Sequence, residues 1–456
     1  MQSRCLQVNA LPEIGKPGDG KTLERMGPSG QAELQLPKRT AIFWFIVIWL
    51  LYVFDILDML AISAVFPAIK AEYHLSDAQL GWLGGVRGLA ALIAAIPVGI
   101  LVDRWSRKYM IAIMSAIWSF FCWATAWMGN YRGLLFTRFM VGAGGAGYNT
   151  AGYALIGAWF PPRQRGVMTG LFNTGQPIGA FVGVGLAGWL AVTFGWRSVF
   201  GIVAIPGFIL AALMLFAPDY KTKKKEKQEE LAVGFNFGEA MRYIIKSPSL
   251  ILLYLAQLGI GMWTFTFSAW VPSFYGRTFN LNMAQAGQAV MFFGLVTIFG
   301  APIGGLLSDW WARRAVNGRV KATLFLTCWC GVFWSLTFTL AIKGYGLVPV
   351  LICWSLSQPA WAGMTAAVIS SIIDVTAPHF RAFATSFVVL FQNITAFIGP
   401  GLAGSISDRM GLTLALFIIM LISIISMVML FFFATRTYAG DLARLKQLGN
   451  FSMDRV

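Results

Sequence analysis

The segments GILVDRWSRK, residues 99–108, and GLLSDWWARR, residues 305–314, are two copies of one pattern. In each copy a glycine is followed four positions later by an aspartate, and cations come after the aspartate. A repeat that recurs in the second half of a chain predicts two structurally related halves. The residues that form the pattern are Gly99, Asp103, Arg104, Arg107, Lys108, Gly305 and Asp309.

Apolar stretches of about 20 residues lie on both sides of these copies, and each is long enough to cross a hydrocarbon core of about 30 Å as a helix. Hydrophobic residues make up 57% of the 456 positions and charged residues 12%, whereas soluble domains carry about 25% charged residues. We therefore expect twelve membrane spans. They cover residues 41–67, 78–102, 109–128, 132–160, 165–194, 197–217, 248–275, 284–308, 321–342, 345–373, 382–406 and 411–435.

A polar and basic segment, residues 218–247, divides these spans into two sets of six. The predicted fold is an all-α membrane protein with twelve transmembrane helices in two pseudo-symmetric six-helix bundles, residues 41–217 and 248–435. Residues 1–40 contain no signal peptide pattern and are predicted to be a disordered cytoplasmic tail. Residues 436–456 are predicted to be a second cytoplasmic tail.

The net charge of +16 does not indicate nucleic-acid binding, because the cations gather in the tails and in every second loop. This is the positive-inside distribution of a bacterial-type inner membrane protein, and it places both termini in the cytoplasm. The loops on the other side carry one or two cations each, such as Lys70, Arg197, Arg277 and Lys343.

The loop pattern around Asp103 resembles the signature between helices 2 and 3 of the major facilitator superfamily. With the twelve spans, the central segment and the second copy, the resemblance covers about residues 41–435. It implies a transporter whose halves rock about a substrate site near the midplane. A carboxylate among cations at the membrane boundary can pair across the halves and gate one access state. The alternative is that these cations only set the orientation in the membrane.

Two helices carry weaker resemblances. The segment FDILDMLAISAVFPAI, with Asp55, Asp58 and Pro67, looks like the helix-1 pattern of aromatic acid:proton symporters. The segment RFMVGAGGAGY, from Arg138, is similar to helix 4 of anion:cation symporters and of Spinster-like lipid transporters. Those families commonly place a glutamate seven positions after the arginine, where this chain has Gly145.

Four charges fall inside the first-half spans, namely Asp55, Asp58, Arg87 and Arg138. Inserting each of these charges into the centre of a bilayer costs about 2.5–3.5 kcal/mol on insertion scales, so each is expected to have a structural or functional role. Counting 1.5 Å per residue places Arg87 at about the depth of Asp58, which permits the Asp58–Arg87 contact that we favour. An arginine could hold a substrate carboxylate while an aspartate carries the proton. The alternative is a set of fixed ion pairs that order the helices.

The second-half spans offer uncharged polar and aromatic groups instead, which would suit a small organic anion with an apolar body. Most aromatic side chains in such helices only pack, so this alternative stays open for each of them. The candidate substrate-binding residues, besides Arg87 and Arg138, are Asn173, Gln176, Gln257, Trp263, Gln358, Trp361, Gln392 and Asn393.

No phosphate-binding loop, nucleophile elbow or spaced metal ligands occur in the chain. We therefore predict no enzyme, metal or cofactor, and a secondary active transporter that couples the proton gradient to symport of a carboxylate, such as an aromatic or sugar acid. The alternatives are an exporter of lipids or amphipathic compounds, and a transceptor that signals through residues 218–247. The expected partners are the small-molecule substrate and the lipid bilayer, with no nucleic acid, and the expected state is a monomer.

Overall fold

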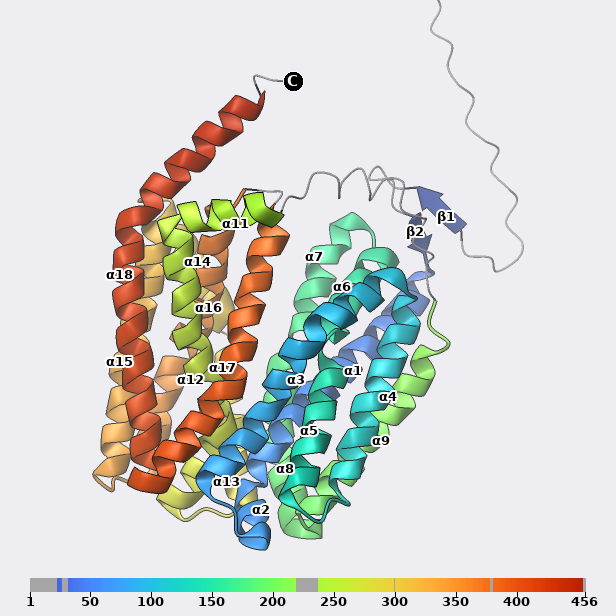
Figure 1. Ribbon diagram of the computed structural model, residues 1–456, viewed down its shortest axis with the longest axis vertical. Helices are drawn as coiled ribbons and strands as arrows, with labels where there is room; N and C mark the ends of the chain where they lie inside the picture. Colours follow the sequence, from blue (N-terminus) through green and yellow to red (C-terminus); the bar gives the residue numbers. More distant parts are fainter. Residues whose placement is uncertain (1–22, 27–31, 219–236, 299, 378–379, 454–456) are drawn as a thin grey trace, which may run out of the picture.

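The computed structural model describes residues 23–26, 32–218, 237–298, 300–377 and 380–453. Two groups of long helices stand side by side, one from each half of the chain (Figure 1). The first long helix begins, and the last one ends, at the same end of the molecule. We call this the terminal end and the other the distal end.

The first half contains a two-stranded hairpin followed by a bundle. A helix break divides three of its spans, at Val65, at Ala146–Gly147 and at Thr174. The elements are β1 (Leu23–Met26), β2 (Ala32–Gln35), α1 (Lys38–Ala64), α2 (Phe66–Tyr73), α3 (Asp77–Arg104), α4 (Arg107–Thr125), α5 (Tyr131–Gly145), α6 (Tyr148–Trp159), α7 (Pro162–Asn173), α8 (Gly175–Phe194) and α9 (Trp196–Met214).

The second half repeats this plan, with α13 and α14 as the two parts of one span. Its elements are α11 (Phe237–Lys246), α12 (Pro248–Phe279), α13 (Met283–Ile298), α14 (Gly300–Ala312), α15 (Gly318–Ile342), α16 (Leu347–Asp374), α17 (Arg381–Met410) and α18 (Leu412–Met453). Within the described residues, nine helical stretches are long and apolar enough to cross a membrane. The remaining spans are interrupted helices or α4, so each half supplies six.

The segments outside the bundles contain secondary structure that the sequence did not predict. In the predicted disordered tail, β1 pairs antiparallel with β2, and α1 begins at Lys38. In the predicted central loop, α11 lies across the terminal end (Figure 1). The predicted C-terminal tail continues α18 as a helix to Met453. This extension is held at its base, because the backbone N–H of Ser249 donates to Asp441 at 2.9 Å.

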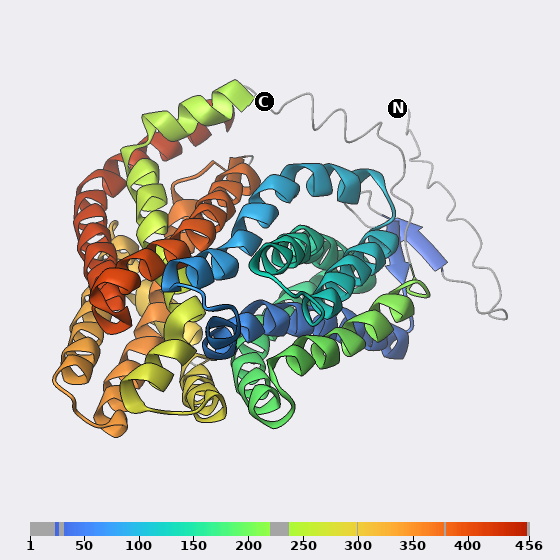
Figure 2. The same ribbon diagram turned by 60° about the horizontal axis from the view of Figure 1, so that its bottom comes forward.

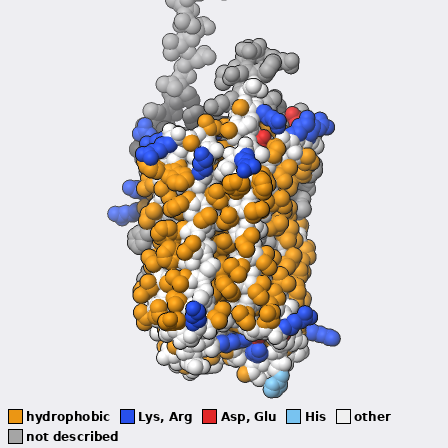
Figure 3. All heavy atoms as spheres, turned by 90° about the vertical axis from the view of Figure 1, so that its left-hand side faces the viewer, with side chains coloured by type: hydrophobic (Ala, Val, Ile, Leu, Met, Phe, Trp, Pro, Cys, Tyr) orange, Lys and Arg blue, Asp and Glu red, His pale blue; other side chains and the backbone are white. Residues whose placement is uncertain are grey.

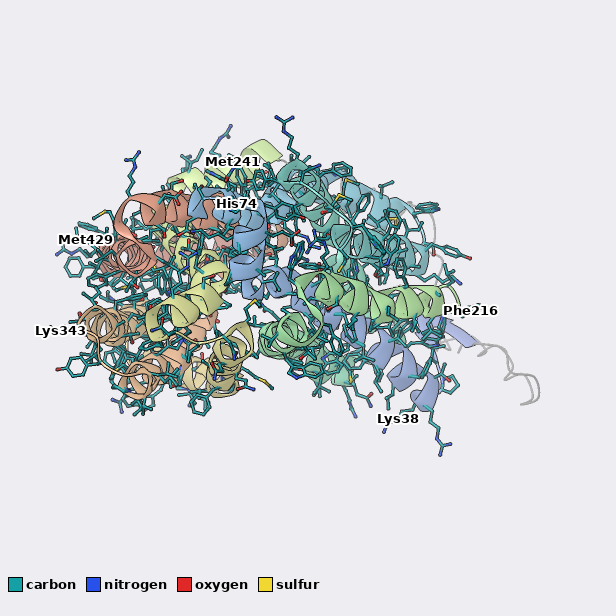
Figure 4. The ribbon with its side chains drawn as sticks, turned by 90° about the horizontal axis from the view of Figure 1, so that it is seen from below. Lys38, His74, Phe216, Met241, Lys343 and Met429 are labelled. Atoms are coloured by element: carbon teal, nitrogen blue, oxygen red, sulfur yellow. The ribbon has the colours of Figure 1, made fainter. Side chains whose placement is uncertain are left out.

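The two halves are packed together through α3 against α17 and α8 against α13. Glycines make the first contact possible: a Cβ on Gly81 would lie 2.1 Å from the carbonyl oxygen of Pro400, and one on Gly85 would lie 2.3 Å from that of Phe397. Seen along the helices from the distal end, Lys343 and Phe216 mark opposite outer edges of the two halves (Figure 4). Figure 2 shows the same two groups of helices side by side.

The outer surface fits a bilayer. The face that carries α15 and α18 is a broad belt of hydrophobic side chains, with Lys and Arg gathered near its two ends (Figure 3). Apolar residues such as Ile422 and Val332 are more than half exposed there. A soluble monomer rarely exposes an apolar patch of such extent, whereas lipid covers it without cost.

Candidate functional site

The first intramembrane ion pair joins α1 to α3. Arg87 Nη2 donates to Asp55 Oδ1 at 2.6 Å, and Arg87 Nη1 lies 3.5 Å from the Asp55 carbonyl oxygen. The pair remains partly accessible, since 15% of the Arg87 side chain and 8% of the Asp55 side chain are exposed. The pair is therefore less enclosed by protein than a fully buried ion pair.

Two glycines of α5 make room for this pair. A Cβ on Gly142 would lie 2.5 Å from the Arg87 carbonyl oxygen, so α5 and α3 approach backbone to backbone. A Cβ on Gly145 would lie 3.1 Å from both Arg87 Nη2 and Asp55 Oδ1. A side chain at position 145 would thus contact the pair, and the carboxylate of the pair comes from α1.

The second ion pair is sealed. Arg138 Nη1 lies 3.1 Å from Asp58 Oδ1, and 3% and 0% of these side chains are exposed. Arg138 Nη2 also donates to Thr125 at 2.7 Å, and the guanidinium lies over the ring of Phe200 at 4.6 Å. Cys122 donates its thiol to Asp58 Oδ1 at 2.9 Å. Helices α4 and α9 thereby surround this pair, which has the burial and the partners of an architectural element.

The predicted contact between Asp58 and Arg87 is wrong. Two residues three positions apart on a helix are separated by about 4.5 Å along its axis, and their side chains point about 60° apart around that axis. Asp55 therefore reaches α3, whereas Asp58 reaches α4 and α5. Counting depth from the sequence is accurate only to about one turn, which is the offset that decides between the two partners.

The second-half candidates fall into two groups. Gln257 and Trp263 are 2% exposed, and Trp263 packs at 4.9 Å on Trp334, a tryptophan that Trp361 also contacts at 4.9 Å. Trp263 is therefore part of a packed aromatic cluster. Gln358 is also largely buried and accepts a hydrogen bond from Thr297 at 3.2 Å.

Gln392 and Asn393 lie on α17, about one turn before the residues that contact α3 at Gly88. A Cβ on Gly88 would contact Ala396 at 2.8 Å, and Arg87 is the neighbour of Gly88. The two amides precede Ala396 on α17 by about one turn, or 5.4 Å. Both amides are half-buried. They therefore lie about one turn to the terminal side of the contact between Gly88 and Ala396.

Asn173 and Gln176 lie on either side of the break between α7 and α8, and both are exposed. Tyr153 donates its hydroxyl to Asn173 Oδ1 at 2.6 Å. The break is tied to the first helix, because Trp49 Nε1 donates to Thr174 at 3.2 Å. These amides are thus positioned by contacts with α6 and α1.

At the distal end an ion-pair network crosses between the halves. Both Nη atoms of Arg277 on α12 lie 2.6 and 2.8 Å from the carboxylate of Asp77, the first residue of α3. Ser407 of α17 donates to the same carboxylate at 2.6 Å, and Lys70 Nζ lies 2.5 Å from it. Asp77 is 3% exposed, so this is a buried connection that holds the halves together.

A helix cap reinforces the same closure. The backbone N–H groups of Asp77 and Ala78 donate to Asp408 at 2.7 and 3.0 Å, so a carboxylate of α17 caps the N-terminus of α3. A Cβ on Gly404, one turn earlier, would lie 2.1 Å from the Asp77 carbonyl oxygen. The glycine permits the close approach that brings the aspartate to the helix end.

The terminal end has a different arrangement. A Cβ on Gly99 or on Gly305 would meet no described atom within 4 Å. Asp309 is bound within its own half, by Arg319 Nη2 at 2.9 Å, and Arg319 Nη1 lies 3.0 Å from Asp374. The side chains of Asp103 and Arg104 lie outside the described residues. Around these glycines the described halves are therefore not in contact, in contrast to the distal end.

The match to a family model covers residues 48–369 and is described as Major Facilitator Superfamily. The chain belongs to the Major Facilitator Superfamily. It is a multi-pass integral membrane transporter and not an enzyme, which confirms both predictions.

Relatives within this superfamily include two bacterial transporters. The chain is 24% identical over 416 residues to the probable galactarate/D-glucarate transporter GudP of Bacillus subtilis (strain 168), covering 81% of this chain and 91% of that protein. It is 27% identical over 274 residues to the hexuronate transporter of Escherichia coli (strain K12), covering 57% and 63%.

Solved structures confirm the predicted fold class. The chain resembles a bacterial homolog of the human lysosomal transporter Spinster, in its inward-facing and unoccupied conformation, with a TM-score of 0.73 at 20% identity over 90% of this chain and 99% of that one. It also resembles a D-xylose-proton symporter, with a TM-score of 0.66 at 13% identity over 85% and 97%. Twelve helices in two six-helix bundles are the architecture of this transporter.

Sequence reasoning missed the distal network of this superfamily member. The sequence predicts Lys70 and Arg277 only as cations of outer loops, and Asp77 and Asp408 are not among the candidate residues. One signal was available, since Gly404 and Asp408 keep the four-residue spacing of Gly99 and Asp103. The spacing thus occurs at both ends of the bundle. In the distal copy the glycine lets α17 approach α3, and the aspartate accepts hydrogen bonds from the start of α3.

Proposed function

We propose that this transporter takes up a small organic anion of the sugar-acid type together with a proton, by alternating access. One observation carries the proposal. Of the two described intramembrane ion pairs, Asp55–Arg87 is partly accessible and Asp58–Arg138 is sealed. A substrate anion can therefore compete for Arg87 without dismantling the packing of the bundle.

The chemistry of exchange follows from the residues. Arg87 stays protonated and can hold a carboxylate through two parallel hydrogen bonds. When the substrate takes the guanidinium, Asp55 loses its opposite charge in a poorly solvated place and binds a proton more readily. Proton and anion would then cross together, because each makes the other's binding more favourable.

The substrate class is supported by the relatives and by the amides. The two bacterial relatives have names that specify galactarate, D-glucarate and hexuronate, which are hydroxylated carboxylates. Gln392 and Asn393 lie about one turn to the terminal side of the contact between Gly88 and Ala396, and amide groups can both donate to and accept from hydroxyls. A carboxylate on the first half and hydroxyls on the second would connect the two halves through one small molecule.

The proposed direction of transport and the proposed cellular location rest on the distribution of basic residues between the two ends. Basic loops lie at the terminal end, so we propose that this end faces the cytoplasm of a bacterial cell. The described closure at the distal end would then correspond to a state open to the cytoplasm. Inward transport would use the proton gradient across the plasma membrane, without a cofactor.

The test is uptake of radiolabelled D-glucuronate and D-glucarate into proteoliposomes, with and without an inward proton gradient. We expect the gradient to accelerate uptake and the outside to become more alkaline in proportion. Arg87→Ala should weaken the substrate affinity by about ten- to hundredfold, as the loss of a charged hydrogen-bonded contact does. Asp55→Asn should make uptake insensitive to the gradient, while exposed Arg132→Ala should match the wild type.

Other outcomes would reject the proposal. Uptake that ignores the gradient in the wild type would exclude proton symport. Transfer of lipid or amphipathic probes without movement of sugar acids would favour the exporter that the sequence left open. Binding of sugar acids without net flux would favour a transceptor.

A further inference from the structure

We propose that the second half holds one anionic phospholipid along the outer seam between α15 and α18. The headgroup site is a cavity of about 470 Å³ at the terminal end, in the turn between α14 and α15. Arg313, Arg314 and Arg319 line it from this turn and the start of α15, and Asp374 and Tyr438 line it from α16 and α18.

The cavity has an excess of positive charge. Arg319 is neutralised by Asp309 at 2.9 Å and Asp374 at 3.0 Å, and Tyr438 also donates to Asp374 at 3.1 Å. Within the described part of the chain, no salt bridge involves the guanidinium groups of Arg313 and Arg314. Both side chains are exposed. Two cations beside a half-enclosed cavity are the arrangement that binds a phosphate group.

The position favours a lipid over a soluble phosphate. Arg314 lies over the ring of Trp310 at 3.5 Å, and Trp310 itself is 48% exposed, as interfacial tryptophans are. A basic pocket between transmembrane helices at the membrane boundary is a typical site for an anionic headgroup.

A second cavity lies below the first on the same two helices. It measures about 660 Å³ and is lined by α15 residues from Cys328 to Thr339 and by Ile424 of α18. Val332 is about 20 Å along α15 from Arg319, and Ile424 is about 21 Å along α18 from Tyr438, at 1.5 Å per residue. This second cavity is a shallow, largely apolar depression, and α15 and α18 are on the face that carries the hydrophobic belt (Figure 3). A basic pocket with an apolar groove beneath it matches one phospholipid, headgroup and acyl chain.

The test is native mass spectrometry of the full chain purified in a neutral detergent, titrated with dioleoyl phosphatidylglycerol or dioleoyl phosphatidylcholine. We expect one tightly retained phosphatidylglycerol and no retained phosphatidylcholine. The double change Arg313→Ala with Arg314→Ala should weaken retention about thirtyfold, from the contribution of each basic residue near a lipid surface. Arg313→Lys with Arg314→Lys keeps the charge and should retain the lipid.

Two control variants distinguish the contribution of the headgroup site from that of the acyl-chain groove, and melting temperatures test whether each variant is folded. Arg436→Ala removes an exposed cation of α18 that lies over Phe432 and does not line the cavity, so retention should not change. Val332→Gln makes the groove polar and should weaken retention of phosphatidylglycerol without altering the arginines. Melting temperatures in lipid-free detergent should be the same for all variants, which shows that each is folded.

Three results would overturn the proposal. Equal retention of phosphatidylglycerol by the wild type and by the double alanine variant would remove the cavity as the site. Equal retention of phosphatidylcholine would make the contact a general one with lipid. Displacement of phosphatidylglycerol by millimolar inorganic phosphate or glycerol 3-phosphate would make the occupant a soluble anion.

Discussion

Asp55 and Asp58 are the same residue type, three positions apart on one helix, yet their surroundings give them different roles. Asp55 has one arginine partner and a partly open side. Asp58 has Arg138 and Cys122 as partners and no exposed surface. A charge can exchange partners only where another group can reach it. The accessible pair is therefore suited to transport and the sealed pair to packing.

The sealed pair should matter for stability. Arg138→Leu leaves Asp58 charged, buried and without its cation, which costs about 3–5 kcal/mol in buried pairs that lose one partner. Thr125→Val removes only one hydrogen bond to Arg138 and should cost about 1–3 kcal/mol. Chemical unfolding in detergent, followed by tryptophan fluorescence, measures both. A loss below about 1 kcal/mol for Arg138→Leu would show that the site rearranges or admits water.

At the scale of elements, short helices are fixed by contacts that apolar periodicity does not reveal. The helix α2 is held to α9 because both Nη atoms of Arg197 lie 2.6 Å from the carboxylate of Glu72, and Trp196 Nε1 donates to it at 2.7 Å. The α18 extension is likewise held by Asp441 against the start of α12. Such polar contacts decide where an element ends.

The Glu72 contact should give a small pH dependence. Hydrogen bonds from Arg197, together with that from Trp196, lower the pKa of Glu72 below its ordinary value. A lowered pKa stabilises the folded protein above the unfolded pKa of about 4.3, and the contribution disappears as the pH falls through the folded pKa. Because the pair is more than a third exposed, the effect should stay below about 1 kcal/mol. Glu72→Gln should therefore flatten the melting temperature between about pH 5 and pH 3, whereas an unchanged slope would contradict this assignment.

The helices also show which features of the structure could be predicted from the sequence. Apolar length was sufficient for the spans, because crossing lipid requires a helix of fixed minimum length. It was not sufficient for α18 beyond residue 435, where a polar segment continues the helix and Asp441 accepts a hydrogen bond from Ser249 of α12. Nor could spacing choose between Asp55 and Asp58 for Arg87, since one turn separates the two answers. The intramembrane charges were found because charge in lipid is costly, but their partners depend on how neighbouring helices are rotated.

The cap on α3 should shift the access equilibrium. Asp408→Ala removes the carboxylate that accepts from the N–H groups of Asp77 and Ala78 but leaves the Ser76–Gln79 capping box, and an anion at a helix N-terminus contributes about 1 kcal/mol at most. Since this contact exists only when the distal ends meet, the closed population should fall at most about fivefold relative to the open one. Pulsed spin-label distances between Ala71 and Met410, two exposed distal positions changed to cysteine after the native cysteines are replaced, measure the populations. Arg409→Ala, which leaves the Asp408 carboxylate in place, is the matched control.

At the scale of the whole molecule, the two ends of the transporter are in different states. At the distal end the glycines of α3 touch the backbone of α17, and an ion-pair network closes over them. At the terminal end Gly99 and Gly305 face open space within the described residues. Rocking requires that the distal contact open while the terminal one closes, so the fit at each end must be reversible. Backbone contact through glycine provides such a fit, because no side chain has to rearrange.

The distal closure itself can be tested with one added side chain. A Cβ on Gly85 would lie 2.3 Å from the Phe397 carbonyl oxygen, so Gly85→Val should prevent α3 and α17 from meeting. We expect a folded protein that stays open at the distal end, with spin-label distances across that end longer than in the wild type, and uptake reduced to the background of empty liposomes. Gly201→Val is the matched control, since a Cβ there meets no described atom within 4 Å. Full uptake by Gly85→Val would mean that transport does not pass through this closed arrangement, because a valine cannot occupy the space that the contact leaves.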